Sequence, residues 1–251
     1  MAALREIETT LLAPRGWRLV QLGSGRYLGH SRNVGIRAAR GDYVFFVDDD
    51  DIGLPHELEV LLCSLETGKV DVVSSYVAYF DTPEVPVEWT KPVSMEQLLQ
   101  IKPDYGFPGV GLGAGVTRNV FGSSRFMLRR ETVEAAGPFH EEWGVGREDH
   151  EYLARLSLMG ATVAVLPVPL FAKRGSGGSG APTMTHTMGE THSLQVSMRP
   201  YLAAVSGHRE DLELVREESW GLGMQDRSGY TESFVAREQL VPWAQAMQQA
   251  S

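Results

Sequence analysis

A predicted helix that leads directly into an apolar strand is the feature that most constrains the fold of this chain. Residues His30–Arg40 favour a helix, and Gly41 follows where a left-handed C-cap is expected. Residues Tyr43–Val47 are apolar on both faces, which is typical of a central, largely parallel strand. The alternation continues with predicted helices at Leu4–Leu12 and from Pro55 to Gly68, and with predicted strands at Trp17–Leu22 and Asp71–Phe80. This order predicts an α/β fold with a wound, mostly parallel sheet.

The rest of the chain extends this pattern and then changes character. Further strands are predicted at Ser124–Leu128 and Thr162–Leu166, and further helices at Glu131–Ala136, Glu148–Met159, Ser193–Val205 and Tyr230–Gln249. A glycine-serine tract at residues 175–180 has the composition of a linker or a mobile loop, natural or engineered. We therefore expect a core over residues 1–172 and, over residues 173–251, a flexible glycine-rich loop with a C-terminal helical extension.

Bulk composition bounds the class of protein. The 251 residues, 43% of them hydrophobic, suffice for one large globular domain or two small ones. The single cysteine, Cys63, excludes an intrachain disulfide and fits a reducing compartment. We find no secretory signal and no apolar run long enough to span a bilayer, so we expect a cytoplasmic protein, free or peripheral to the membrane. A formal net charge of -9 argues against a binder of duplex nucleic acid.

Four consecutive carboxylates follow the apolar strand. Asp48–Asp51 lie at its carboxyl end, the edge at which wound α/β sheets bind ligands. Packed carboxylates repel one another, and a hard divalent cation such as Mg²⁺ or Mn²⁺ relieves that repulsion. Because side chains alternate along an extended chain, Asp48 and Asp50 face one side, and Asp49 and Asp51 face the other. The alternative is a solvated acidic turn, which the preceding apolar strand makes the less favoured interpretation.

Basic and imidazole side chains are candidates for the surroundings of such a cation. Arg32 and Asn33 lie in the first turn of the predicted helix, where backbone N–H groups and the helix dipole favour a phosphate. Arg174, just before the glycine-serine tract, is a candidate for a pyrophosphate, and His186 is a candidate further metal ligand. For each of them the alternative is an ordinary surface residue, which for His186 is the commoner outcome.

A second acidic motif follows a glycine-flexed loop. Glu148 and Asp149 stand in the first turn of the predicted helix Glu148–Met159. Acidic residues at a helix start are ordinary capping chemistry, and that alternative stays open. A carboxylate at a helix N-terminus is also kept ionised, however, as a general base requires.

Taken together, these stretches resemble the GT-A glycosyltransferases, and family 2 among them. The resemblance rests on the segments Ser31–Asp51 and Ser123–Pro167 and on the later motifs AKR, MTHTM and MRPYL. It implies that Asp48 and Asp50 bind the diphosphate of a nucleotide-diphosphate sugar through Mg²⁺ or Mn²⁺, with Asp48 also near the ribose. It further implies that Asp149 is the catalytic base of an inverting displacement and that Glu148 shapes the acceptor site. The acceptor hydroxyl would belong to a glycan, a lipid-linked sugar, a small molecule or a protein.

The chain departs from the family pattern at its start. Family members normally open with a strand, a helix and a second strand that build much of the nucleoside pocket, and this chain begins at what corresponds to the second helix. We therefore expect a sheet that lacks those strands, with exposed apolar surface that favours homo-oligomers. Two alternative functions stay open: a nucleotide-sugar-binding module that is inactive without a partner, and a nucleotidyltransferase. The second is disfavoured because Gly23-Ser24-Gly25 matches a phosphate loop poorly.

Overall fold

The computed structural model describes residues 2–23, 28–49, 51–80, 107, 109, 115, 119–141, 146–174 and 195–204. Its helices are α1 (Ala2–Ile7), continued by a π-helical turn (Glu8–Leu12) and a 3₁₀ turn (Ala13–Arg15), then α2 (Leu28–Ala38), α3 (Glu57–Gly68), α6 (Arg130–Ala136), α7 (Glu148–Leu158) and α9 (Arg199–Ala204). Its strands are β1 (Tyr43–Phe45), β2 (Asp51–Gly53), β3 (Val72–Phe80), β4 (Phe126–Arg129) and β5 (Val163–Arg174).

These strands form one sheet in the order β1-β4-β3-β5-β2. The pair β3 and β5 is parallel, whereas β4 pairs antiparallel with both β1 and β3, and β2 pairs antiparallel with β5. As a result β1, β3 and β5 run in one direction, as the wound α/β pattern predicts. The expectation that Tyr43–Val47 is a central strand is wrong for the described sheet, because β1 stands at its end and pairs only with β4.

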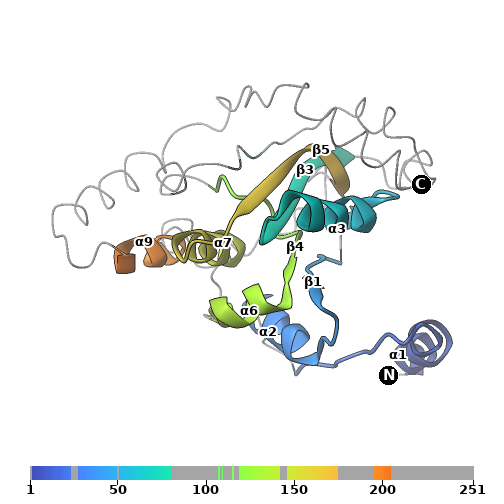
Figure 1. The fold of residues 1–251 in the computed structure, drawn as a ribbon. Helices are drawn as coiled ribbons and strands as arrows, with labels where there is room; N and C mark the ends of the chain where they lie inside the picture. Colours follow the sequence, from blue (N-terminus) through green and yellow to red (C-terminus); the bar gives the residue numbers. More distant parts are fainter. Residues whose placement is uncertain are drawn as a thin grey trace.

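Helices cover both faces of this sheet (Figure 1). On one face, Val44, Phe46, Phe126 and Leu128 pack with apolar residues of α6 and α7 and with Ile36 of α2. On the other face, Met127 and Val73 pack with Val60, Leu61 and Leu65 of α3. Successive residues of one strand thus pack into the hydrophobic cores on opposite faces of the sheet, which explains why these strands are apolar on both faces.

Two expected elements differ from the structure, and one observed strand was not expected. Residues 17–23 form no strand: they are largely exposed, and Arg18 donates a side-chain hydrogen bond to the Ala38 carbonyl at the end of α2. The strand expected at Thr162–Leu166 continues to Arg174, because its register with β3 shifts at Tyr76 and accommodates the two prolines. The short strand β2 was not expected, since it begins inside the run of aspartates.

Several expectations lie outside the described residues. These are the positions of Asp50 and His186, the tract at residues 175–180, and the helix expected at Tyr230–Gln249. Among the described helices, none combines the length and the hydropathy that crossing a bilayer requires.

Candidate active site

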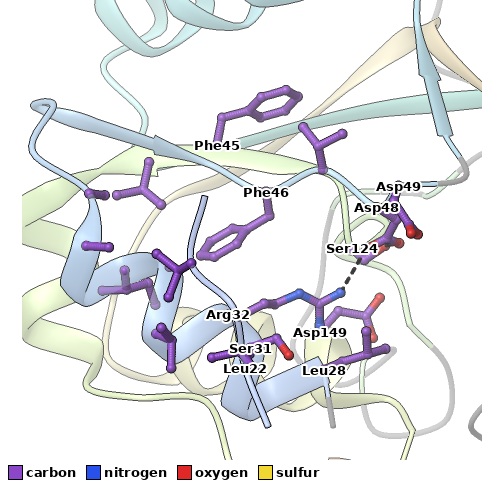
Figure 2. Close-up of a pocket in the computed structure, with 18 of the residues that line it drawn as sticks. Leu22, Leu28, Ser31, Arg32, Phe45, Phe46, Asp48, Asp49, Ser124 and Asp149 are labelled. Atoms are coloured by element: carbon purple, nitrogen blue, oxygen red, sulfur yellow. Dashed lines mark hydrogen bonds and ion pairs between the residues drawn. The ribbon is translucent and has the colours of Figure 1, made fainter. Parts of the chain in front are cut away.

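A groove of about 1570 Å³ runs along β1 and past its carboxyl end. Its polar end is lined by Arg32, Asp48, Asp49, Ser124, Glu148 and Asp149, which come from four separate segments of the chain. Its lining also includes the apolar residues Trp17, Leu22, Leu28 and Val47, all of them exposed. Figure 2 shows Arg32 extending toward Asp48 and Ser124, with Asp149 and Leu28 drawn near it. The groove therefore combines charged side chains with exposed apolar ones.

Arg32 occupies the centre of the charged end. It extends from α2 and is only 9% exposed. One guanidinium nitrogen donates to Oδ1 of Asp48 at 3.2 Å, and another donates to Oε1 of Glu148. Burial opposes the charged form, but Glu148, Asp149 and Asp48 together raise the pKa of Arg32. The structure thus brings the predicted phosphate ligand together with both acidic motifs, and Arg32 serves as their common counter-ion (Figure 2).

Asp48 remains ionised although it is largely buried. Burial alone would raise its pKa, but a 2.6 Å hydrogen bond from Ser124 Oγ and the charges of Arg32 and Lys173 hold that pKa below its usual value. The described part of the chain contains no cluster of three or more side chains able to ligate a metal. Mg²⁺ needs only one or two carboxylates when substrate phosphates supply the rest. An ionised Asp48 beside the exposed Asp49 fits that requirement.

The first turn of α7 separates the roles of two neighbouring acids. Arg147 has a left-handed backbone with φ of 63° and turns the chain into this helix. Glu148 is 5% exposed and paired with Arg32, and burial followed by the charge of Asp149 raises its pKa. Asp149 is half-buried, lines the groove, and accepts a 2.8 Å hydrogen bond from the His150 amide through Oδ1. Asp149 is therefore the acid of this turn that a ligand in the groove can reach.

The buried side chain of His150 holds the first turn of α7 in place. It is 1% exposed, and because a carbonyl can only accept, its Nε2 donates the 2.9 Å hydrogen bond to the oxygen of Gly115. Burial lowers the pKa of His150 to about 4, so the imidazole is neutral. The first turn of α7 is thereby tied to the glycine-rich segment that contains Gly115.

Asn33 does not face the groove as a phosphate ligand. Its amide nitrogen donates to the Phe139 carbonyl and to Glu141, both at 2.8 Å, and its oxygen accepts from the Phe139 amide at 2.8 Å. The predicted role is therefore wrong, because these bonds use the Asn33 side chain to hold α2 against the segment around Phe139. For Arg174 the structure places only the backbone, at the end of β5.

Two groups of the site were not predicted, Ser124 and Lys173. Ser124 precedes β4, and because β4 runs antiparallel to β1 its beginning lies beside the end of β1. A purely parallel sheet would have placed it at the opposite edge. Lys173 pairs in register with Asp51 across β5 and β2, and Lys173 Nζ lies 3.7 Å from Asp48 Oδ2. Lys173 was missed because the strand was predicted to end at Leu166, before its two prolines, whereas β5 continues past them.

Comparisons with known proteins identify the family of the chain. The protein-family model described as Glycosyl transferase family 2 matches residues 2–131, which is more than half of the chain. An uncharacterized glycosyltransferase of Haemophilus influenzae is 30% identical over 92 residues, which cover 33% of this chain and 30% of that protein. The chain thus matches less than a third of that curated relative.

Solved structures extend the agreement to the fold. Residues 1–349 of S. aureus TarS, in complex with UDP-GlcNAc, superpose with a TM-score of 0.57 at 18% identity, over 99% of this chain and 67% of that one. A longer TarS structure gives a TM-score of 0.55 at 18% identity, over 96% of this chain and 39% of that one. The expected GT-A fold is confirmed, and the family match identifies the chain as a member of glycosyl transferase family 2.

Proposed function

We propose that this chain transfers a sugar from a nucleotide-diphosphate sugar to an acceptor hydroxyl, with a divalent cation and with inversion at the anomeric carbon. The observation that carries the proposal is the Arg32 bridge, which sets an ionised Asp48 and the acid turn of Glu148 and Asp149 around one end of a groove. The family match and the UDP-GlcNAc bound by TarS support a nucleotide-sugar donor.

In this mechanism the diphosphate lies at the end of β1. Asp48, Asp49 and the neighbouring Asp50 are the carboxylates available to hold Mg²⁺ or Mn²⁺, which when bound would neutralise diphosphate charge. Asp149 takes the proton of the acceptor hydroxyl while its oxygen attacks the anomeric carbon, and the nucleoside diphosphate leaves with the electrons of the broken bond. Glu148 keeps Arg32 in place rather than contacting substrate.

The test is release of nucleoside diphosphate from UDP- and GDP-sugars in the presence of Mn²⁺ or Mg²⁺, with a panel of acceptors. Asp149→Asn should lower turnover by about 10²–10⁴-fold, the range expected when a general base is removed. Asp42→Asn is the matched control, because Asp42 is exposed and lies outside the groove. Undiminished turnover in Asp149→Asn would remove this residue from the mechanism.

A second candidate is a donor-binding module that acts only with a partner. The specific observation in its favour is the exposed apolar lining of the groove, where Trp17 is 62% and Val47 is 52% exposed. A partner subunit or a second copy of this chain would bury it. Calorimetry with UDP and Mn²⁺ separates the candidates, because binding without turnover supports the module and turnover by the isolated chain rejects it.

A further inference from the structure

Lys173 stands between two of the four consecutive aspartates. Its ammonium nitrogen is 3.7 Å from Oδ2 of Asp48 and 3.6 Å from Oδ1 of Asp51. The pairing of β5 with β2 places Lys173 directly opposite Asp51 in register. Its side chain is 28% exposed, so the ammonium group lies at the boundary between the acidic cluster and solvent.

Asp51 is held from the other side by a buried arginine. Its carboxylate is 1% exposed, and Oδ2 lies 3.8 Å from Nη1 of Arg125. Arg125 donates two short hydrogen bonds to Glu57, at 2.5 and 2.6 Å, so its charge is largely committed to that partner. Lys173 is thus a second cationic partner of Asp51, and this pairing holds the lysine at the site.

Charged side chains of both signs gather at this end of the sheet. Three cations, Arg32, Arg125 and Lys173, face four carboxylates, Asp48, Asp51, Glu57 and Glu148. Among the described residues that line the groove, Asp49 and Asp149 add negative charge and Arg147 adds positive charge. Of the three cations, Arg32 and Arg125 side chains are 8% and 5% exposed and make direct hydrogen bonds to carboxylates. Lys173 has the greatest exposure and reaches these two aspartates at ion-pair distances longer than a direct hydrogen bond.

We propose that Lys173 is the resident counter-cation of the acidic donor site, and that a divalent cation binding at Asp48 displaces its ammonium group. The inference rests on the proposed role of Asp48 as a cation ligand. Without the metal, Lys173 keeps Asp48 and Asp51 compensated and the end of β1 assembled. When the metal arrives, one cation replaces another at Asp48, while Asp51 retains the lysine nearby. Lys173 thus sets the affinity of the site for the metal.

The experiment is calorimetric titration of Mn²⁺ into the metal-free full chain, without a sugar donor. Lys173→Met keeps most of the aliphatic stem and removes the charge, so the competing cation is lost. Mn²⁺ should bind about tenfold more tightly than to the wild type, because a unit charge near a divalent ion is worth at least that much even in a watery environment. Lys173→Arg, which keeps the charge, should bind Mn²⁺ like the wild type.

Two further variants make the result decisive. Lys69→Met makes the same charge change on an exposed residue just after the far end of α3, and should leave Mn²⁺ affinity unchanged. Lys173→Met could fail to fold because Asp51 loses a cationic partner. In that case the comparison is made in an Asp51→Asn background, with and without Lys173→Met, where residue 51 carries no charge. A tighter site on loss of the lysine charge is expected in that background as well.

The outcomes separate this inference from the proposed function. Equal or weaker Mn²⁺ binding on loss of the Lys173 charge, with the wild type binding normally, overturns the counter-cation role alone. Tighter binding in Lys173→Met, together with a wild type that turns over no nucleotide sugar, supports the inference and contradicts the proposed function. No Mn²⁺ binding to either protein overturns the inference together with the metal dependence of the proposed reaction.

Discussion

Arg32 and Arg125 use the same chemistry on opposite sides of β1, with different consequences. Each is a buried arginine paired with a buried glutamate, Glu148 for Arg32 and Glu57 for Arg125. Arg125 is enclosed between Phe45 and Phe171, with its guanidinium 5.4 and 5.3 Å from their ring centres, and it does not line the groove. Arg32 faces the groove and divides its hydrogen bonds between two acidic motifs.

The comparison shows that burial of an ion pair does not by itself mark a functional site. The Arg125 pair joins α3 to the sheet outside the groove, so a ligand in the groove would not contact it. The Arg32 pair joins α2, the end of β1 and α7, which are the segments a donor and an acceptor would touch. Variants of the two arginines should therefore separate a loss of stability from a loss of activity.

Arg125→Met should produce the largest effect. Both Glu57 and Asp51 would lose a cationic partner in a buried environment, so we expect the free energy of unfolding to fall by about 4–5 kcal/mol. Urea unfolding followed by circular dichroism measures the change. The double variant Arg125→Met with Glu57→Leu should recover much of it, because no buried charge is left at Glu57. A single variant as stable as the wild type would show that the pair is not needed to join α3 to the sheet.

His150 extends the comparison, because it stands beside Asp149 yet is as buried as Arg125. Its pKa is lowered to about 4 from 6.5, so the unfolded chain binds a proton below about pH 6.5 that the folded chain does not. The stability contributed by neutral His150 is present above pH 6.5 and is lost as the pH falls toward 4, up to about 3 kcal/mol. His150→Gln can still donate to Gly115 but does not titrate. Relative to this variant, the wild type should lose stability in urea unfolding between about pH 7 and pH 4.5; parallel curves would contradict the buried neutral imidazole.

Arg32→Lys tests the arginine that faces the groove. The charge is kept, but a single ammonium group cannot reproduce the planar fork that reaches Asp48 and Glu148 together. We expect nucleotide-sugar turnover to fall about 10–30-fold, with a smaller loss of urea midpoint than in Arg125→Lys because Arg32 borders the open groove. Arg125→Lys is the matched control and should show the reverse: a lower midpoint with normal turnover of the folded protein. Equal losses of activity in both variants would erase the distinction between the two sides.

Glu66→Gln should give the smallest effect. Glu66 pairs with Arg129 and accepts a hydrogen bond from Tyr43 on the outer surface, where water screens both charges. We expect no measurable change in the urea midpoint or in turnover. A clear loss of stability would mean that exposed arginine pairs contribute as buried ones do, and the contrast between Arg32 and Arg125 would then need another explanation.

The sequence was most informative where the apolar residues of a segment follow a single helical or strand pattern. The helical spacing in α2 and α7 and the unbroken apolar run of β1 predicted these elements. That Arg32, Asp48, Glu148 and Asp149 belong to one site was implied by the family resemblance, and the structure brings these side chains together. Strand direction was not readable, because an apolar strand looks the same whether its neighbour is parallel or antiparallel. That ambiguity concealed Ser124, which reaches Asp48 only because β4 is antiparallel to β1. Asn33 was predicted to bind a phosphate because of its place near the start of a helix. Its side-chain amide instead forms hydrogen bonds with the backbone of Phe139, which is distant in the sequence.

The shared guanidinium of Arg32 has a consequence for the order of events at the site. A ligand that draws Asp48 away leaves Arg32 more strongly committed to Glu148, and it changes the field at Asp149. Two substrates that meet at one counter-ion are thermodynamically linked. The factor by which the donor alters affinity for the acceptor must equal the factor by which the acceptor alters affinity for the donor. A single side chain on α2 is thus sufficient to make the two halves of the groove respond to each other.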